Sequence, residues 1–129
     1  MFDLTAEEAR LLLNVALMAI GRNRFKSAAK ILAALERFRP DQASLAVAKA
    51  IALISALNFA AAVQYIDEEG LVRFPDSAML QAFKGMALLR MGRFEDAREP
   101  LEAAVRGTDP AAAKLAADLL GDENLGGNR

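Results

Sequence analysis

The segment ASLAVAKAIALISAL, residues 43–57, contains a single charged residue, Lys49. A helix on the surface of a soluble protein has one apolar stripe and one polar face, so a helix that is apolar all round is either a central core element or a membrane span. The overlapping uncharged run, residues 50–66, is shorter than the roughly 20 apolar residues of a span, and Asn58 and Gln64 interrupt it. We therefore expect residues 43–57 to form a helix that is covered by protein, either by other helices of the chain or by a partner.

The composition favours one small helical domain without catalytic chemistry. The chain has 129 residues, of which 54% are hydrophobic and 26% are charged, enough for one modest core. A net charge of −1 gives no electrostatic reason to bind nucleic acid or to insert into an anionic membrane. The absence of cysteine and histidine removes disulfides, thiolate chemistry, imidazole bases and most zinc sites. We therefore predict that the protein is not an enzyme and needs no cofactor or metal.

The first residues, MFDLTAEEARLLL, carry acids where a secretory signal has its basic region, so we expect a cytoplasmic protein. Thr5 and Glu8 have the spacing of a capping box, in which each side chain bonds a backbone amide of the other residue at a helix start. Leu4 is the expected staple residue before this cap. These signals predict a helix that begins at Ala6.

The spacing of apolar residues and the positions of glycine and proline predict seven helices and no strand. The predicted helices span residues 6–20, 24–38, 43–57, 59–69, 76–91, 93–106 and 111–120. Gly70 is a candidate C-cap, and Pro100 predicts a kink or a late start in its helix because proline lacks an amide donor. Residues 121–129 are glycine-rich and polar, which predicts a flexible, dispensable tail.

An internal repeat of 34 or 35 residues runs through the chain. Its positions hold a phenylalanine, an alanine, a branched apolar residue and a proline: Phe25, Phe59 and Phe94; Ala28, Ala62 and Ala97; Leu32, Ile66 and Leu101; Pro40, Pro75 and Pro110. We expect the alanines to lie where two helices approach closely, because a larger side chain there would force the helices apart. The phenylalanines are expected to fill the turn between paired helices.

The segments FKSAAKIL, FAAAVQYI and FEDAREPL, at residues 25–32, 59–66 and 94–101, resemble the second half of the tetratricopeptide repeat. The resemblance implies an all-α, right-handed α-solenoid within a single domain, residues 6–120. Its three repeats would cover about residues 9–42, 43–76 and 78–110, and a capping helix would cover residues 111–120.

The first halves of the repeats follow the family less closely. Small residues, Ala16, Ala50 and Gly85, occupy the glycine position of the family. Lys49 and Lys84 stand where leucine is usual, and the chain has no tryptophan.

The resemblance also implies a binding surface, because the first helices of successive repeats line a concave groove in this family. The corresponding positions are all apolar: Leu13, Leu17, Ile20, Val47, Ile51, Ile54, Met79, Ala82, Met86 and Leu89. An apolar groove suits an amphipathic helix, since methionines adapt to the shape of the ligand. Two alternatives stay open: these residues pack on one another, or the C-terminal helix folds back and fills the groove.

A short chain filled by three repeats with an apolar groove is similar to the bacterial chaperones of type III secretion needle subunits, the YscG/PscG type. That resemblance implies sequestration of a needle subunit's amphipathic helix, with a second small helical co-chaperone alongside. The alternatives are a chaperone of type III translocators, a general tetratricopeptide scaffold or adaptor and, in another class, a self-associating structural protein that forms a homodimer when free.

Two other clusters are weaker candidates for function. Asp67, Glu68 and Glu69 are consecutive, so on a helix they point in different directions and cannot converge as an acid–base or metal pair. Basic residues flank Phe25 and Phe38, a pattern found in nucleic-acid binders. Phe25 belongs to the repeat, however, and acidic residues balance the cations, so we expect no nucleic-acid binding.

Overall fold

The computed structural model describes residues 5–38 and 42–127, with side chains described up to residue 121, and all regular elements in these ranges are helical. The predicted all-α class is thereby confirmed. The chain forms two compact units, residues 1–58 and residues 59–129, which we describe separately. The single domain predicted from the sequence stays a prediction.

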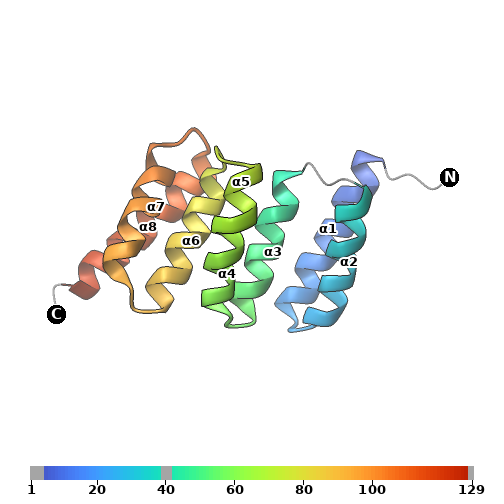
Figure 1. Ribbon diagram of the computed structural model, residues 1–129, viewed down its shortest axis with the longest axis horizontal. Helices are drawn as coiled ribbons and strands as arrows, with labels where there is room; N and C mark the ends of the chain where they lie inside the picture. Colours follow the sequence, from blue (N-terminus) through green and yellow to red (C-terminus); the bar gives the residue numbers. More distant parts are fainter. Residues whose placement is uncertain (1–4, 39–41, 128–129) are drawn as a thin grey trace. The chain divides into compact units, whose positions relative to one another are not determined.

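Three helices make up the described part of the first unit: α1 (Ala6–Gly21), α2 (Phe25–Phe38) and α3 (Ala43–Ser55). Figure 1 shows α1 and α2 as an antiparallel hairpin, and α3 packs against both of them. Their common core consists of small and branched apolar side chains, Ala16, Leu32, Leu35, Leu45 and Ala48. The predicted bounds of these helices agree with the structure to within two residues.

The capping box predicted at the start of α1 is confirmed. The Glu8 backbone N–H donates to the Thr5 hydroxyl oxygen at 3.1 Å, and the Thr5 backbone N–H donates to the Glu8 carboxylate at 2.9 Å. Hydrogen bonding by the Thr5 backbone and then by its side chain lowers the pKa of Glu8 below its ordinary value. The cap therefore fixes the start of α1, and it favours the negatively charged form of Glu8 there. Leu4, the predicted staple residue, lies outside the described residues.

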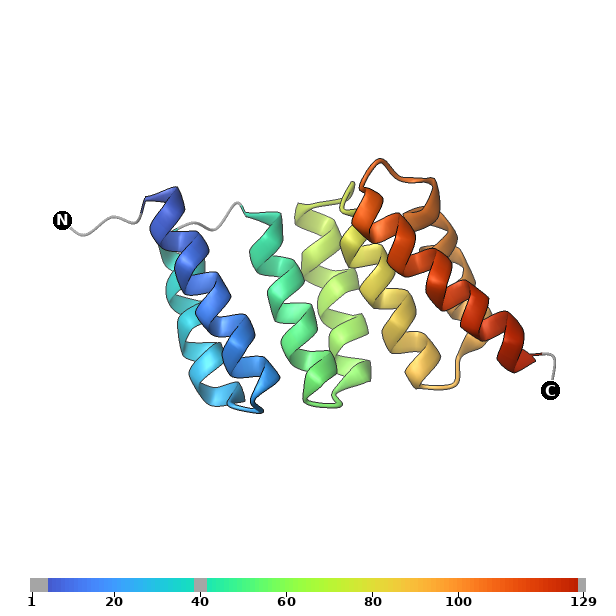
Figure 2. The ribbon, with the colours of Figure 1, turned by 180° about the vertical axis from the view of Figure 1, so that it is seen from behind.

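The second unit contains short helices followed by three longer ones. They are α4 (Phe59–Tyr65), the π-helix η1 (Ile66–Gly70), α5 (Leu71–Arg73), α6 (Ala78–Arg90), α7 (Phe94–Arg106) and α8 (Pro110–Gly127). Figure 1 shows α6 and α7 as a second antiparallel hairpin. Figure 2, from behind, shows α8 lying along this hairpin, and α8 contacts both helices.

The predicted end of the fourth helix at Gly70 is wrong. Gly70 has helical dihedrals, φ −61° and ψ −56°, and the chain stays helical to Arg73. A Cβ at Gly70 would lie 3.1 Å from Leu80 Cδ1, so glycine allows η1 to approach α6 closely. This repeat has one more residue between Ile66 and its closing proline than the first repeat has between Leu32 and Pro40. The third repeat has the same extra residue between Leu101 and Pro110, yet α7 contains no π-helix, so the extra residue alone does not explain η1.

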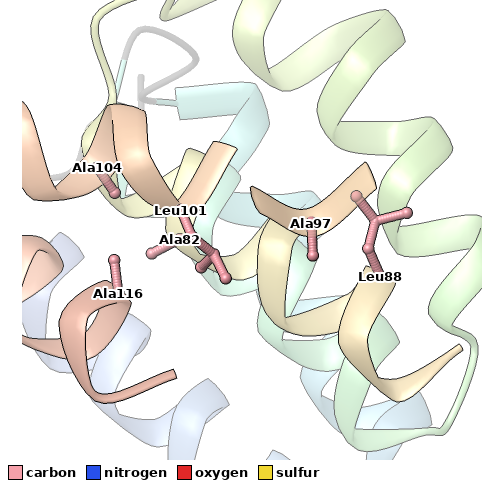
Figure 3. Close-up of a cluster of buried hydrophobic side chains, with 6 residues drawn as sticks. All are labelled: Ala82, Leu88, Ala97, Leu101, Ala104 and Ala116. Carbon is pink, nitrogen blue, oxygen red and sulfur yellow. The ribbon is translucent and has the colours of Figure 1, made fainter. Parts of the chain in front are cut away.

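The core of the second unit lies between α6, α7 and α8. Figure 3 shows its buried side chains, which come from all three helices: Ala82, Leu88, Ala97, Leu101, Ala104 and Ala116. Gly85 on α6 faces Leu101 so closely that a Cβ would come within 2.4 Å of the leucine. At the start of α6 the Leu80 N–H donates to the Ser77 hydroxyl oxygen at 3.2 Å, a cap that the sequence analysis missed. These contacts fix α6 at the centre of the unit.

Two further predictions about the C-terminal helices need correction. Pro100 lies buried inside α7, which begins at Phe94, so the expected late start is wrong. Helix α8 continues through Gly121 to Gly127, beyond the predicted end at residue 120. A glycine inside a helix costs only about 1 kcal/mol relative to alanine and does not end the helix by itself. Residues 128–129 lie outside the described residues.

The turns after α1, α3 and α6 each contain one residue with left-handed backbone. These are Asn23 (φ 62°), Leu57 (φ 65°) and Gly92 (φ 77°), spaced by 34 and 35 residues like the sequence repeat. Asparagine and glycine tolerate this conformation, whereas the Cβ of leucine clashes with the backbone there. The Leu57 side chain is 71% exposed, so its packing offsets little of the energetic cost of this backbone conformation. The repeat thus imposes a backbone conformation that leucine does not favour.

We expect Leu57→Gly to stabilise the protein and Gly92→Leu to destabilise it, each by about 1 kcal/mol. Both residues hold the same position of the repeat, so the two substitutions exchange leucine and glycine in opposite directions at equivalent turns. Urea denaturation of the two variants and the unaltered chain measures both effects. Changes of the same sign would contradict the equivalence of the two turns.

Candidate functional site

An open hollow of about 190 Å³ lies in the first unit, where α1 and α3 begin. Its floor is apolar and its rim is polar, and the lining residues are Ala6, Ala9, Arg10, Leu13, Leu35, Gln42, Ser44 and Leu45. A lining of this kind suits an apolar side chain of a ligand, and its polar residues can bond polar groups at the edge of that ligand.

The hollow lies on the face that the sequence assigned to a groove. Leu13 is both a predicted groove residue and part of the lining. Leu17 follows it by one turn on α1, while Val47 and Ile51 follow the lining residue Ser44 along one face of α3. These four apolar side chains are half-buried, so each keeps part of its surface open to solvent. The structure therefore places Leu13 at the hollow and leaves Leu17, Val47 and Ile51 partly open on two helices that contact each other. We call these four side chains and the hollow the α1/α3 face.

Three predicted groove residues are corrected, because Ile20, Ile54 and Ala82 are buried. Ala82 has no exposed surface and belongs to the core cluster of the second unit, together with Ala116 of α8 (Figure 3). Helical spacing placed Ala82 on the predicted groove face of α6, but it did not show that the packing of α8 covers part of that face. Ile20 and Ile54 are only 4% and 9% exposed and Ala82 is fully buried, so these three side chains offer a partner little or no surface.

The other predicted residues of α6 are half-buried. Met79, Met86 and Leu89 lie at helical spacing on α6, and Leu89 packs against the core of the second unit. Leu115, Leu119 and Leu120 of α8 pack against the same core. In the second unit, then, α8 takes up part of the contact that the sequence assigned to a partner, and Met79 and Met86 keep part of their surface exposed.

Two equivalent ion pairs that were not predicted from the sequence recur at the interval of the repeat. Lys49 on α3 pairs with Glu36 on α2, and Lys84 on α6 pairs with Asp67 on η1, where the Lys84 Nζ and the Asp67 Oδ1 are 2.7 Å apart. The two lysines hold the same position of the sequence repeat. Each lysine reaches an acid on a helical segment that comes earlier in the chain. The signal was present as two lysines spaced by 35 residues, each preceded by acidic residues.

The acidic run is a solvated helix segment, as the sequence indicated. Asp67, Glu68 and Glu69 are exposed on η1, and the first of them faces Lys84. Among the described residues, no group of three acidic side chains is arranged to hold a metal ion. Within residues 5–38 and 42–127, no helix has both the length and the apolar character needed to cross a membrane. Comparisons with protein families, with curated proteins and with solved structures found no match for this chain.

Proposed function

We propose that this chain is a protein-binding module that holds an amphipathic helix of another protein on the α1/α3 face. The observation that carries the proposal is the row of half-open apolar side chains beside the hollow, on two helices that lie side by side. An amphipathic helix presents apolar side chains at spacings of three and four residues, which enter such a surface as anchors. The polar rim would meet the edge of the apolar face of the ligand.

The proposal includes a fold of three tetratricopeptide-like repeats in a right-handed α-solenoid, closed by α8. Burial at the repeat positions supports this arrangement. The alanines of the repeat are fully buried, and so are the small residues at the glycine position: Ala28, Ala62 and Ala97; Ala16, Ala50 and Gly85. The recurrence of left-handed turn residues at the same intervals is a second, independent support. Packing of α8 on α6 and α7 fits the role of a capping helix.

The cellular role that fits this surface best is that of a cytoplasmic chaperone for a self-assembling subunit. A needle subunit of type III secretion is the partner implied by the resemblance of the repeats. Burying its helix would hide the apolar surface that drives polymerisation until secretion, and a second small co-chaperone could bind alongside. A translocator chaperone or a scaffold would use the same α1/α3 face, so the choice of ligand distinguishes them.

The ligand is tested with the C-terminal helix of a type III needle subunit as a labelled peptide, and with a peptide of the same composition in scrambled order. Ile51→Asp is expected to weaken binding of the native peptide at least about tenfold, because a carboxylate desolvated against apolar anchors is penalised by more than 1.4 kcal/mol. Ile51 is the best site for this test, since it is half-buried and, unlike Leu17, does not pack against the core of the first unit. Fluorescence anisotropy gives the dissociation constants.

Ala33→Asp is the matched control, because Ala33 is exposed on α2 and does not belong to the α1/α3 face. It is expected to bind the peptide as the unaltered chain does. Circular dichroism must first show that both variants are folded. Equal binding of the native and the scrambled peptide, or full binding by a folded Ile51→Asp variant, would refute the proposed function.

A further inference from the structure

Helix α1 has a second apolar face, opposite the one that packs on α2 and α3. Leu11, Val15 and Met18 are 59%, 49% and 59% exposed and lie four and three residues apart, so they form one stripe along the helix. Among the described residues, no other helix exposes three large apolar side chains. A helix that is apolar on both faces is normally covered on both. The stripe therefore marks a contact surface distinct from the α1/α3 face.

Charges of opposite sign stand at the two ends of the stripe. Glu7 precedes Leu11 by one turn, and Arg22, the C-cap of the helix, follows Met18 by one turn. Along the helix, the stripe thus has acidic Glu7 at its start, three apolar side chains in its middle and basic Arg22 at its end. An identical helix laid antiparallel would place Glu7 against the partner's Arg22 and Leu11 against the partner's Met18, with Val15 beside the two-fold axis. A parallel copy would instead place like charges side by side.

We propose that two copies of this chain associate through the stripe, with their α1 helices antiparallel. The self-complementary order of charge and apolar surface is what selects a second copy as the occupant. The 16 residues of α1 span about 24 Å at 1.5 Å per residue. A single helix pair of that length buries less area than the roughly 1,200 Å² or more of a stable interface. The dimer is therefore weak and reversible.

Sedimentation velocity from about 5 to 500 µM tests the association. The unaltered chain is expected to shift from monomer to dimer across this range, and Val15→Lys is expected to remain monomeric because it places two ammonium groups at the axis. Val105→Lys is the matched control, since Val105 is 39% exposed on α7 and is not part of the stripe. A chain that stays monomeric throughout, or a dimer that Val15→Lys leaves unchanged, would overturn the proposal.

The orientation can be tested by crosslinking, because the natural chain contains no cysteine. An antiparallel pair predicts that a Leu11→Cys chain forms a disulfide with a Met18→Cys chain when the two are mixed, and that neither forms one efficiently with itself. Self-crosslinking of each variant alone would overturn the antiparallel arrangement. A monomeric chain in which Val15→Lys, but not Ile51→Asp, weakens binding of the needle peptide would assign the stripe to that peptide instead.

Charge reversal provides a final check of the pairing. Glu7→Arg and Arg22→Glu are each expected to weaken the dimer, and the double variant is expected to recover it, because the opposite charges face each other again across the axis. Failure of the double variant to exceed both single variants would contradict the contact between Glu7 and the partner's Arg22. None of these changes touches the α1/α3 face, so the dimer and the proposed function can fail independently.

Discussion

Ala28→Arg is expected to unfold the first unit. Ala28 is fully buried on α2, a helix that packs on both α1 and α3. An arginine there would either bury an unpaired charge or separate the helices, at a cost of at least about 4 kcal/mol. That cost is a large part of the roughly 5–15 kcal/mol that stabilises a typical domain. Circular dichroism during urea denaturation measures the loss.

The neighbouring residue provides a matched control for this change. Ala29 is exposed, and arginine is nearly as good a helix former as alanine. Ala29→Arg is therefore expected to change the free energy of unfolding by less than about 0.5 kcal/mol. Similar effects of the two variants would show that the repeat register places the wrong residue at the helix contact.

Gly85→Val is expected to be as damaging in the second unit. A Cβ at Gly85 would lie 2.4 Å from both Cγ and Cδ2 of Leu101, which is itself fully buried, so α6 and α7 would have to move apart. We expect a loss of more than about 3 kcal/mol in the free energy of unfolding. Gly21→Val is the control, because nothing lies within 4 Å of a Cβ at Gly21. Valine has a higher helix propensity than glycine, so Gly21→Val is expected to change the free energy of unfolding by less than about 1 kcal/mol.

A double variant tests whether the Leu101 contact causes the damage. Gly85→Ala and Leu101→Ala each destabilise alone, by overpacking and by a cavity, respectively. Combined, they are expected to cost less than the sum of the two, since the truncated leucine makes room for the new methyl group. Thermal denaturation of the four proteins gives the coupling energy. Strict additivity would mean that the damage at Gly85 arises elsewhere.

Regular spacing made the helices and their closest contacts predictable. The repeat intervals of 34 and 35 residues between Ala28, Ala62 and Ala97 identified three positions that are fully buried in the structure. Thr5 and Glu8 predicted the start of α1, since a cap depends only on residues three apart. In both cases the sequence records the pattern directly, as a repeat of residue types or as a pair within one helical turn.

Features that depend on neighbouring elements were not predictable in the same way. Ala82 was assigned to a surface, yet the packing of α8 buries it. Phe94, expected to fill a turn, is 51% exposed, whereas its repeat equivalents Phe25 and Phe59 are half-buried. The second and third repeats each have one residue more than the first before the closing proline. The second repeat forms a π-helix at Ile66–Gly70 and α7 of the third does not, so residue types alone do not tell whether a helix or a loop absorbs the extra residue.

The candidate site likewise combines features that the sequence pattern predicts with features that depend on how neighbouring helices pack. Its apolar character and its location on α1 and α3 followed from the repeat register, because every position at that spacing is apolar. The hollow beside Leu13 depends on how the starts of α1 and α3 lie next to each other, which no local pattern records. Likewise, the exposed stripe on α1 became visible only once the structure showed which of its two apolar faces is covered.

Binding of a helix on the α1/α3 face is tested most directly by methyl NMR of the chain, labelled at isoleucine, leucine, valine and methionine and titrated with the needle peptide. We predict saturable shifts for the methyl groups of Leu13, Leu17 and Ile51, and unchanged positions for those of Leu11 and Met18 on the opposite face of α1. Shifts confined to Leu11 and Met18, or no saturable change at any methyl group, would contradict binding on the α1/α3 face.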